Sequence, residues 1–294
     1  MSLTTTSNRP STGPPSRRQL LEYKAARALA VGVSRLYLPG LVTGRENLPP
    51  TGAYLLAPVH RSYVDWLIVG RVTGKRRMRY IAKAEIWKSK LVGRILEALG
   101  VFPVNRSGAD REALERCREV LAGGEPLVMF PEGTRRSGPV VSDLREGVAY
   151  LALRAGVPVV PVGIGGSERA MPRGSAIPRP RRVEVVIGKP IWPSTANMGL
   201  PGGAGPRAAD GAGAEGAGDE GAGAAGAADE EDGAAGAADD GAGAASGDVA
   251  GAGSRKSGRV SRRATKEFSD ELAAGIQGVF DEAQRRAGVK TKTA

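Results

Sequence analysis

The 294-residue chain has little of several residue types: one histidine, one cysteine and 4% aromatic residues. A single cysteine excludes an intramolecular disulfide, and we predict that Cys117 is a small core residue on the apolar face of a helix. No run of about 18 uncharged apolar residues occurs, so no membrane-spanning helix is expected. The polar, proline-rich stretch before Arg17 lacks a short apolar core with a cleavage site, so no secretory signal is expected.

Charge is distributed unevenly along the chain. Residues 199–254 are nearly all glycine, alanine, aspartate and glutamate, with eleven acids and one base; because the whole chain carries +11, the remainder carries +21. So little apolar bulk cannot offset the entropy of ordering, and we expect this segment to be disordered. The basic remainder predicts an anionic partner, nucleic acid or anionic lipid. The few aromatics, without a helix–turn–helix, ribonucleoprotein or zinc-finger pattern, disfavour nucleic acid.

Two amphipathic helices are expected on either side of a central region. Between residues 17 and 42, apolar residues recur at helical spacing with basic residues among them. A helix of this kind lies in the lipid headgroup layer or packs on its own domain, and the positive charge favours the membrane. A second pattern at 265–286 predicts a helix that packs back onto the domain, with a free partner-binding helix as the alternative.

The central region alternates between strand and helix patterns, and its strands are continuous apolar runs. This alternation predicts an α/β fold, a single domain with a largely parallel central sheet flanked by helices. We expect strands at 53–57, 78–82, 101–104, 127–130, 157–164 and 183–187, and helices at 63–73, 85–99, 110–122 and 146–154. The expected boundaries are a disordered tail at 1–16, a membrane-associating helix at 17–43, the α/β domain at 44–198, a disordered acidic linker at 199–263 and a C-terminal helix at 264–288.

The single histidine, His60, follows the expected first strand, and Asp65 comes five residues later. Imidazole titrates near neutral pH and suits a general base, while a neighbouring carboxylate orients it. The two side chains meet if His60 ends the strand and Asp65 lies in the next helical turn, where open α/β sheets bind ligands. Ser62 lacks the Gly-x-Ser-x-Gly context of a nucleophile. The simplest mechanism is therefore direct attack of a hydroxyl, activated by His60, on an acyl carbonyl.

Two further motifs follow predicted strands and are expected to complete the same site. Gly-Val-Phe-Pro-Val-Asn-Arg ends at Arg106, whose planar donors match phosphate oxygens in pairs; a surface arginine is the alternative. Phe-Pro-Glu-Gly-Thr-Arg ends at Arg135, which is a second candidate for phosphate. Within it, Gly133 permits a tight turn, and Glu132 either accepts from a glycerol hydroxyl or orients an arginine.

A fourth segment, at 157–164, reads Val-Pro-Val-Val-Pro-Val-Gly-Ile. Pro158 and Pro161 limit backbone pairing, which favours an edge strand or a strand with a break. Core structure is the default role of this segment, with Pro161 and Gly163 expected to shape a pocket wall.

Together, these four ordered motifs resemble the 1-acyl-sn-glycerol-3-phosphate acyltransferase family of glycerolipid acyltransferases, over about Leu41 to Pro193. Lys83-Ala-Glu85 also resembles the family pattern. The resemblance implies His60 as base with Asp65 as its partner, and neither a metal nor a cofactor. The residues that it places around the acceptor phosphate and glycerol are Arg106, Glu132, Gly133, Thr134 and Arg135.

The resemblance also implies the partners: acyl-CoA or acyl carrier protein as donor, lysophosphatidate as acceptor, and peripheral attachment to the cytoplasmic face of a membrane. The leading hypothesis is therefore acyl transfer to the sn-2 hydroxyl, giving phosphatidate. One alternative is a relative that acylates glycerol-3-phosphate or another lysophospholipid. The other is a non-catalytic basic protein that binds lipid or nucleic acid, which the intact dyad disfavours. The acidic linker and the single N-terminal helix depart from the family pattern.

Overall fold

A computed structural model describes residues 16–72, 76–104, 110–175, 177–194 and 260–289. The expected disordered tail and acidic linker lie outside these residues, apart from Ser16 and residues 260–263. Ser16 and Ser261 are helix N-caps, and each side chain accepts a hydrogen bond from a backbone N–H of the first turn. Serine suits this position because its oxygen satisfies a donor that has no partner within the helix.

The strands form one sheet in the order β1-β7-β6-β2-β5-β3-β4. β6, β2, β5, β3 and β4 run parallel, whereas β1 and β7 run in the opposite direction at one edge. This arrangement confirms the expected α/β class with a largely parallel sheet. The strands are β1 (Val42–Thr43), β2 (Leu55–Pro58), β3 (Arg79–Lys83), β4 (Val101–Val104), β5 (Leu127–Val128), β6 (Val159–Gly165) and β7 (Glu184–Ile187).

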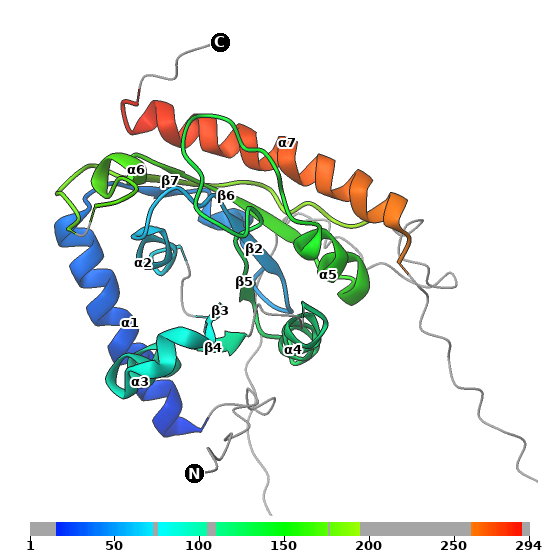
Figure 1. Cartoon of the computed structure of the whole chain (residues 1–294), viewed down its shortest axis with the longest axis horizontal. Helices are drawn as coiled ribbons and strands as arrows, with labels where there is room; N and C mark the ends of the chain where they lie inside the picture. The colour runs from blue at the N-terminus through cyan, green and yellow to red at the C-terminus, as the bar shows by residue number, and fades with distance from the viewer. Residues whose placement is uncertain (1–15, 73–75, 105–109, 176, 195–259, 290–294) are drawn as a thin grey trace, which may run out of the picture. The chain divides into compact units, whose positions relative to one another are not determined.

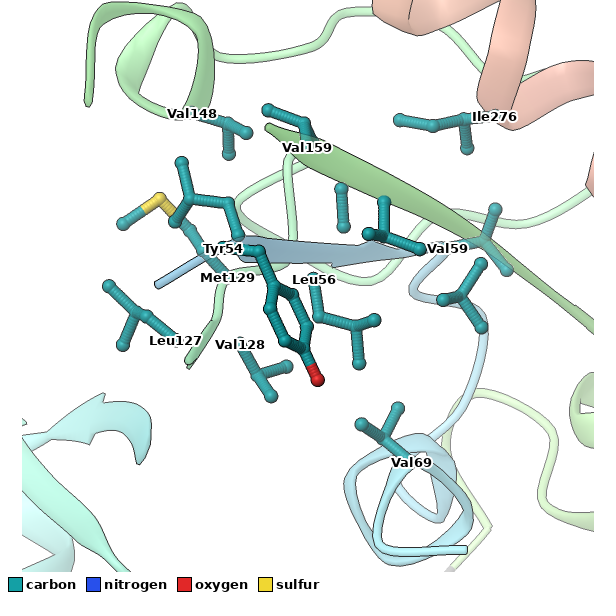
Figure 2. Close-up of a cluster of buried hydrophobic side chains, with 14 of the residues drawn as sticks. Tyr54, Leu56, Val59, Val69, Leu127, Val128, Met129, Val148, Val159 and Ile276 are labelled. Carbon is teal, nitrogen blue, oxygen red and sulfur yellow. The ribbon is translucent and has the colours of Figure 1, made fainter. Parts of the chain in front are cut away.

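Helices cover both faces of the sheet, with α1, α2 and α3 on one face and α4, α5 and α7 on the other (Figure 1). In the core, Val69 of α2 lies on one side of β2, and Val148 of α5 and Ile276 of α7 lie on the opposite side (Figure 2). The helices are α1 (Arg17–Tyr37), α2 (Asp65–Val69), α3 (Lys90–Ala98), α4 (Asp110–Ala122), α5 (Gly147–Ala155), α6 (Ser167–Ala170) and α7 (Arg262–Arg286), with short 3-10 helices at η1 (Arg45–Asn47) and η2 (Ala84–Lys88).

The C-terminal helix α7 lies directly on β6. A Cβ added at Gly163 would come within 2.1 Å of the Val279 carbonyl oxygen, and one at Gly165 within 2.0 Å of the Ala283 carbonyl oxygen. Glycine is therefore required at both positions for the backbones to approach so closely. The apolar face of α7 is buried through Phe268, Leu272, Ile276 and Phe280.

Several local predictions differ from the structure. The helix expected at 85–99 is divided at Ser89, which directly follows the 3-10 helix and whose side chain caps α3. β6 is an interior strand and not an edge strand, although its ladder does break. Its pairing with β7 is irregular between the Val159–Ile191 bridge and the Val162–Ile187 pair, and Pro161, which has no N–H to donate, lies in this gap.

The structure bears on the expectations for the single cysteine and for membrane-spanning helices. Cys117 is buried on α4, and burial raises the pKa of its thiol to about 12, as befits a small core residue. Among the described helices, none combines the length and the apolar character needed to cross a bilayer.

Candidate active site

His60 lies immediately beyond the carboxyl end of β2, beside the loop that follows the neighbouring strand β5. The backbone N–H of Val59 still donates to Val162 on β6, at 3.0 Å. The carbonyl of His60 then accepts from the N–H of Arg136 at 2.9 Å, and the Phe130 ring packs on the imidazole with 4.2 Å between centroids. The sheet and the loop after β5 thus restrain the histidine.

The His60–Asp65 pair forms as the spacing predicted, with the aspartate at the first residue of α2. His60 Nδ1 and Asp65 Oδ2 lie 3.0 Å apart. The same oxygen accepts from the backbone N–H groups of Arg61 and Ser62, each at 2.6 Å. Asp65 is fully buried, whereas the His60 side chain is 21% exposed. The carboxylate therefore holds Nδ1–H, and the opposite ring nitrogen, Nε2, is the one able to receive a proton.

Ser62 has no geometry for a nucleophile. Its side chain is buried, and its hydroxyl donates to the carbonyl of Met171 at 2.9 Å. The hydroxyl proton is therefore engaged with a backbone acceptor away from the imidazole. This contact agrees with a mechanism that has no serine intermediate.

Glu132 requires a correction to the expectation that it binds the acceptor. Its carboxylate is buried and both oxygens have internal partners: Oε2 accepts from the N–H of His60 at 2.8 Å and Oε1 from the guanidinium of Arg61 at 2.5 Å. Burial raises the pKa of Glu132, and the Arg61 charge opposes this shift. Of the two roles weighed for Glu132, the contacts favour orienting an arginine, and the carboxylate additionally supports the histidine backbone.

Through Arg61, the catalytic loop contacts the C-terminal helix. The guanidinium of Arg61 lies over the Phe280 ring of α7, 4.9 Å from its centroid, and donates to the Val140 carbonyl at 3.0 Å. Gln277 of α7 holds the same loop, accepting from the N–H of Val141 at 2.7 Å and donating to Pro139 at 3.0 Å. This connection was not predictable from sequence patterns, because Arg61 and Phe280 lie more than two hundred residues apart in the chain.

The remaining expected acceptor residues have different outcomes. Gly133, Thr134 and Arg135 line the same pocket as His60. The guanidinium of Arg135 also lies over the Tyr63 ring, 3.2 Å from its centroid, which orients its charge beside the dyad. Arg106 lies outside the described residues.

The pocket in front of His60 has a volume of about 560 Å³, which is in the range of small-molecule sites. Its cationic side chains include Arg27, Lys83 and Arg135, and most of its remaining lining is apolar. Residues from α1, α2, β3 and α3 form these apolar walls, and they include Ala30, Val31, Trp66, Leu67, Ile81, Val92, Leu96 and Leu99. The apolar helical pattern of α1 was visible in the sequence. The sequence did not show that the inward face of this helix would form a wall of the pocket.

Pro161 and Gly163 do not line this pocket, so the expectation that they shape its wall needs correction. Both lie on β6 against the other layer of helices: Gly163 meets the backbone of Val279, and Pro161 packs near Gly188 and Gly275. They shape the contact between the sheet and α7.

No group of three or more histidine, cysteine, aspartate or glutamate side chains in the described residues has the geometry of a metal site. The site consists of an oriented imidazole, a cationic guanidinium and an apolar pocket. This combination can take a proton from a hydroxyl while an acyl chain and an anionic group are held nearby.

Comparison with known proteins shows which family this region of the chain resembles. Residues 41–165 match the protein-family model described as Acyltransferase. This region includes β1 to β6, the His60–Asp65 pair and the motif that ends at Arg135. Residues 41–165 are therefore similar to the acyltransferase family, as the motifs predicted.

More particularly, the chain is similar to proteins named 1-acyl-sn-glycerol-3-phosphate acyltransferases. One, a chloroplastic protein of Brassica napus, is 31% identical over 161 residues, or 53% of this chain and 46% of the relative. Another, of Bacillus subtilis, is 28% identical over 51% of this chain and 72% of the relative. The chain spans about half the length of the plant relatives that it matches.

A solved structure supports the same grouping. The crystal structure of a 1-acyl-sn-glycerophosphate acyltransferase from Thermotoga maritima matches with a TM-score of 0.52 and 25% identity, covering 62% of this chain and 74% of the other. The resemblance inferred from the four motifs is thus confirmed.

Proposed function

We propose that this protein transfers a fatty acyl group from acyl-CoA or acyl carrier protein to the sn-2 hydroxyl of 1-acyl-glycerol-3-phosphate, which yields phosphatidate. The observation that carries the proposal is the His60 Nδ1–Asp65 Oδ2 contact of 3.0 Å beside a pocket that is mostly apolar. The names of the relatives support the choice of reaction and acceptor.

In the proposed mechanism, His60 Nε2 takes the proton of the acceptor hydroxyl as its oxygen attacks the thioester carbonyl. A C–O ester bond forms, the C–S bond breaks, and the imidazolium returns its proton to the leaving thiolate. Asp65 keeps the proton on Nδ1 and stabilises the positive charge of the imidazolium. The Arg61–Glu132 pair positions the histidine backbone and does not touch the substrate.

The pocket has chemistry for both ends of a lysophosphatidate. Arg135 lines the pocket beside His60 and offers planar donors to the phosphate, for which Arg106 is a second proposed partner. The apolar walls from α1, α2 and α3 suit an acyl chain, which is favoured there because it leaves water.

We further propose peripheral attachment to the cytoplasmic face of the cell membrane through α1. The outward surface of this helix carries large apolar side chains that are at least half exposed: Leu21, Leu29, Val33 and Leu36. Basic residues accompany them and also lie exposed: Arg17, Lys24 and Arg35. An amphipathic helix of this composition partitions into the headgroup layer of anionic lipid.

The test is acyl transfer from labelled acyl-CoA to lysophosphatidate, glycerol-3-phosphate and lysophosphatidylcholine, with acyl carrier protein thioester as a second donor. We expect product from lysophosphatidate, and a loss of roughly 10³-fold in turnover in His60→Ala, because a positioned general base contributes factors of this order. Asp65→Asn should also lose most activity, since it no longer fixes the charge and tautomer of the imidazole.

Matched variants separate this mechanism from its rivals. Ser62→Ala should retain transfer to within about tenfold of wild type, because its hydroxyl only donates to the Met171 carbonyl and accepts a longer hydrogen bond from the Val64 N–H. If Ser62→Ala were as inactive as His60→Ala, a covalent serine mechanism would replace direct attack. Product from glycerol-3-phosphate alone would mean that the acceptor is glycerol-3-phosphate and not lysophosphatidate. Undiminished turnover of a folded His60→Ala variant would contradict the role of His60 as general base.

A further inference from the structure

The segment between α6 and β7 lies at the same end of the sheet as His60, the end where the parallel strands finish. β6 reaches this end at Gly165, and the antiparallel β7 begins opposite it at Glu184, so the described residues between them must lie there. The Ser62 hydroxyl donates to the Met171 carbonyl at 2.9 Å, which joins the start of this segment to the catalytic loop. The segment is therefore part of the surroundings of the active site.

This segment combines one exposed apolar side chain with several exposed cations. Ile177 is 73% exposed. The arginines around it in the sequence are all exposed, and they are Arg173, Arg179, Arg181 and Arg182. A single exposed isoleucine is unremarkable in itself. Its arginine-rich surroundings, however, match the pattern of segments that contact anionic lipid, where cations bind headgroups and an apolar tip enters the interface.

The same segment continues the outward surface of α1. The Tyr37 hydroxyl, at the last residue of α1, donates to the Pro178 carbonyl at 2.8 Å, and the segment after α6 lies beside the C-terminal end of this helix (Figure 1). Next to this hydrogen bond in the sequence are Leu36, 88% exposed, and Leu41, 63% exposed. Ile177 thus extends an apolar surface that already belongs to α1, and the arginines add to the charge of Arg35.

We propose that residues 172–175 and 177–182 are a second membrane-contacting element, which binds anionic phospholipid beside α1 and turns the end of the sheet that carries His60 toward the bilayer. We name these residues the basic loop. Charge complementarity selects this occupant, since four arginines lie within eleven residues. The purpose of this contact rests on the proposed function. Two membrane contacts, α1 and the basic loop, define the orientation of the protein, so an acceptor held in the bilayer meets His60 without leaving the lipid.

A site-specific label tests the insertion of Ile177. Because Cys117 is buried and the chain has no other cysteine, an environment-sensitive fluorophore can be attached at Ile177→Cys alone. The matched control is Ala274→Cys, at an exposed position of α7 on the other face of the sheet. With vesicles of equal parts phosphatidylcholine and phosphatidylglycerol, we expect a blue shift at 177 and none at 274. Equal spectra with and without vesicles at 177 would overturn the proposal.

A charge series tests the arginines. Arg173→Gln, Arg179→Gln and Arg181→Gln together should weaken partition onto the phosphatidylglycerol vesicles about 100-fold, because each cation near an anionic surface contributes on the order of a fivefold factor. The control triple removes the same charge from α4 and α7, at Arg118, Arg263 and Lys266. Equal weakening by both triples would mean that only net charge matters, and the proposal would fail. It would also fail if the basic-loop triple lost oligonucleotide binding but kept vesicle binding.

Failure of this inference can be told apart from failure of the proposed function. Vesicle partition is measured without turnover, so a transferase-inactive protein still reports on the basic loop. Conversely, the basic-loop triple should keep wild-type turnover with lysophosphatidate dispersed in neutral detergent and lose turnover only on vesicles. A similar loss with both substrates would show that the arginines act on the reaction and not on membrane contact.

Discussion

The first and last helices of the structure have similar amphipathic patterns in the sequence but different environments in the fold. α7 buries its apolar face on β6, and its outer surface carries ion pairs such as Lys266–Asp270 and Arg286–Glu282. α1 has only Tyr23 and Ser34 buried, and large apolar residues remain on its outer side. An apolar stripe in the sequence therefore does not identify the surface against which it packs. For α7 this surface is the sheet, whereas for α1 we propose that it is a pocket ligand on the inner side and lipid on the outer side.

The largest effect on stability is expected at Phe280 of α7. Phe280→Ala removes a fully buried ring and should lower the free energy of unfolding by about 3–5 kcal/mol. It also removes the ring beneath the Arg61 guanidinium, so turnover should fall more than KM rises. The control on α1 is Leu36→Ala, which should change stability by less than about 0.5 kcal/mol. Denaturant unfolding measures both, and equal effects would erase the distinction between the helices.

A second pair of variants adds one methyl group at a glycine, once where α7 packs on β6 and once on the exposed side of α1. Gly165→Ala places a Cβ against the Ala283 backbone of α7 and should cost about 2–3 kcal/mol, because two backbones must separate. Gly32→Ala on α1 meets nothing within 4 Å and should stabilise the helix by up to about 1 kcal/mol. Thermal unfolding would contradict the packing of α7 on β6 if Gly165→Ala were neutral.

The free energy of unfolding is expected to depend on pH through Glu132, which pairs with Arg61 beneath α7. Burial raises the pKa of Glu132 above its unfolded value, so the folded state binds more protons in the window between the two values. The stability contributed by this group is complete below the unfolded pKa and is lost as pH rises through the folded pKa. The excess stability of wild type over Glu132→Gln should therefore shrink as pH rises above the ordinary glutamate range. A difference that grows with pH, measured by urea unfolding, would contradict the sign.

The smallest effect on stability, and a large one on membrane binding, is expected on the outer side of α1. Leu29→Ser, Val33→Ser and Leu36→Ser together should leave the unfolding free energy within about 1 kcal/mol of wild type, since all three are at least half exposed. Partition onto anionic vesicles should nevertheless fall, because these side chains no longer enter the lipid interface. Unchanged flotation with vesicles would favour the alternative that α1 serves only its own domain.

Much of the site was predictable because its signals are local. The signal is a histidine directly after an apolar strand, with a carboxylate five positions later in the next turn. The bounds of β4 and α4 are also those expected from their patterns, because each is a short run with clear ends. The break at Ser89 was missed because a capping serine within an apolar pattern looks like an ordinary helical residue.

The roles that were mispredicted depend on distant partners. Glu132 lies in a motif that suggests substrate binding, but Arg61, 71 residues earlier, takes its charge inside the protein. Pro161 and Gly163 lie in another motif, and their contacts explain them better than the pocket does: Gly163 meets the backbone of α7 at Val279, and Pro161 packs near Gly188 and Gly275. In each case the sequence shows which side chain is unusual but not which face of the sheet it occupies.

By itself, the sequence determined the α/β class, the helical character of both ends, the identity of the dyad and the resemblance to glycerolipid acyltransferases. These follow from periodicity and short-range spacing, which act within one or two elements. Only the tertiary structure decided that Glu132 supports His60, that α7 reaches the catalytic loop through Arg61, and that α1 and the basic loop share a surface. These depend on strand order and helix packing, because contacts between residues far apart in the chain exist only after the sheet has assembled.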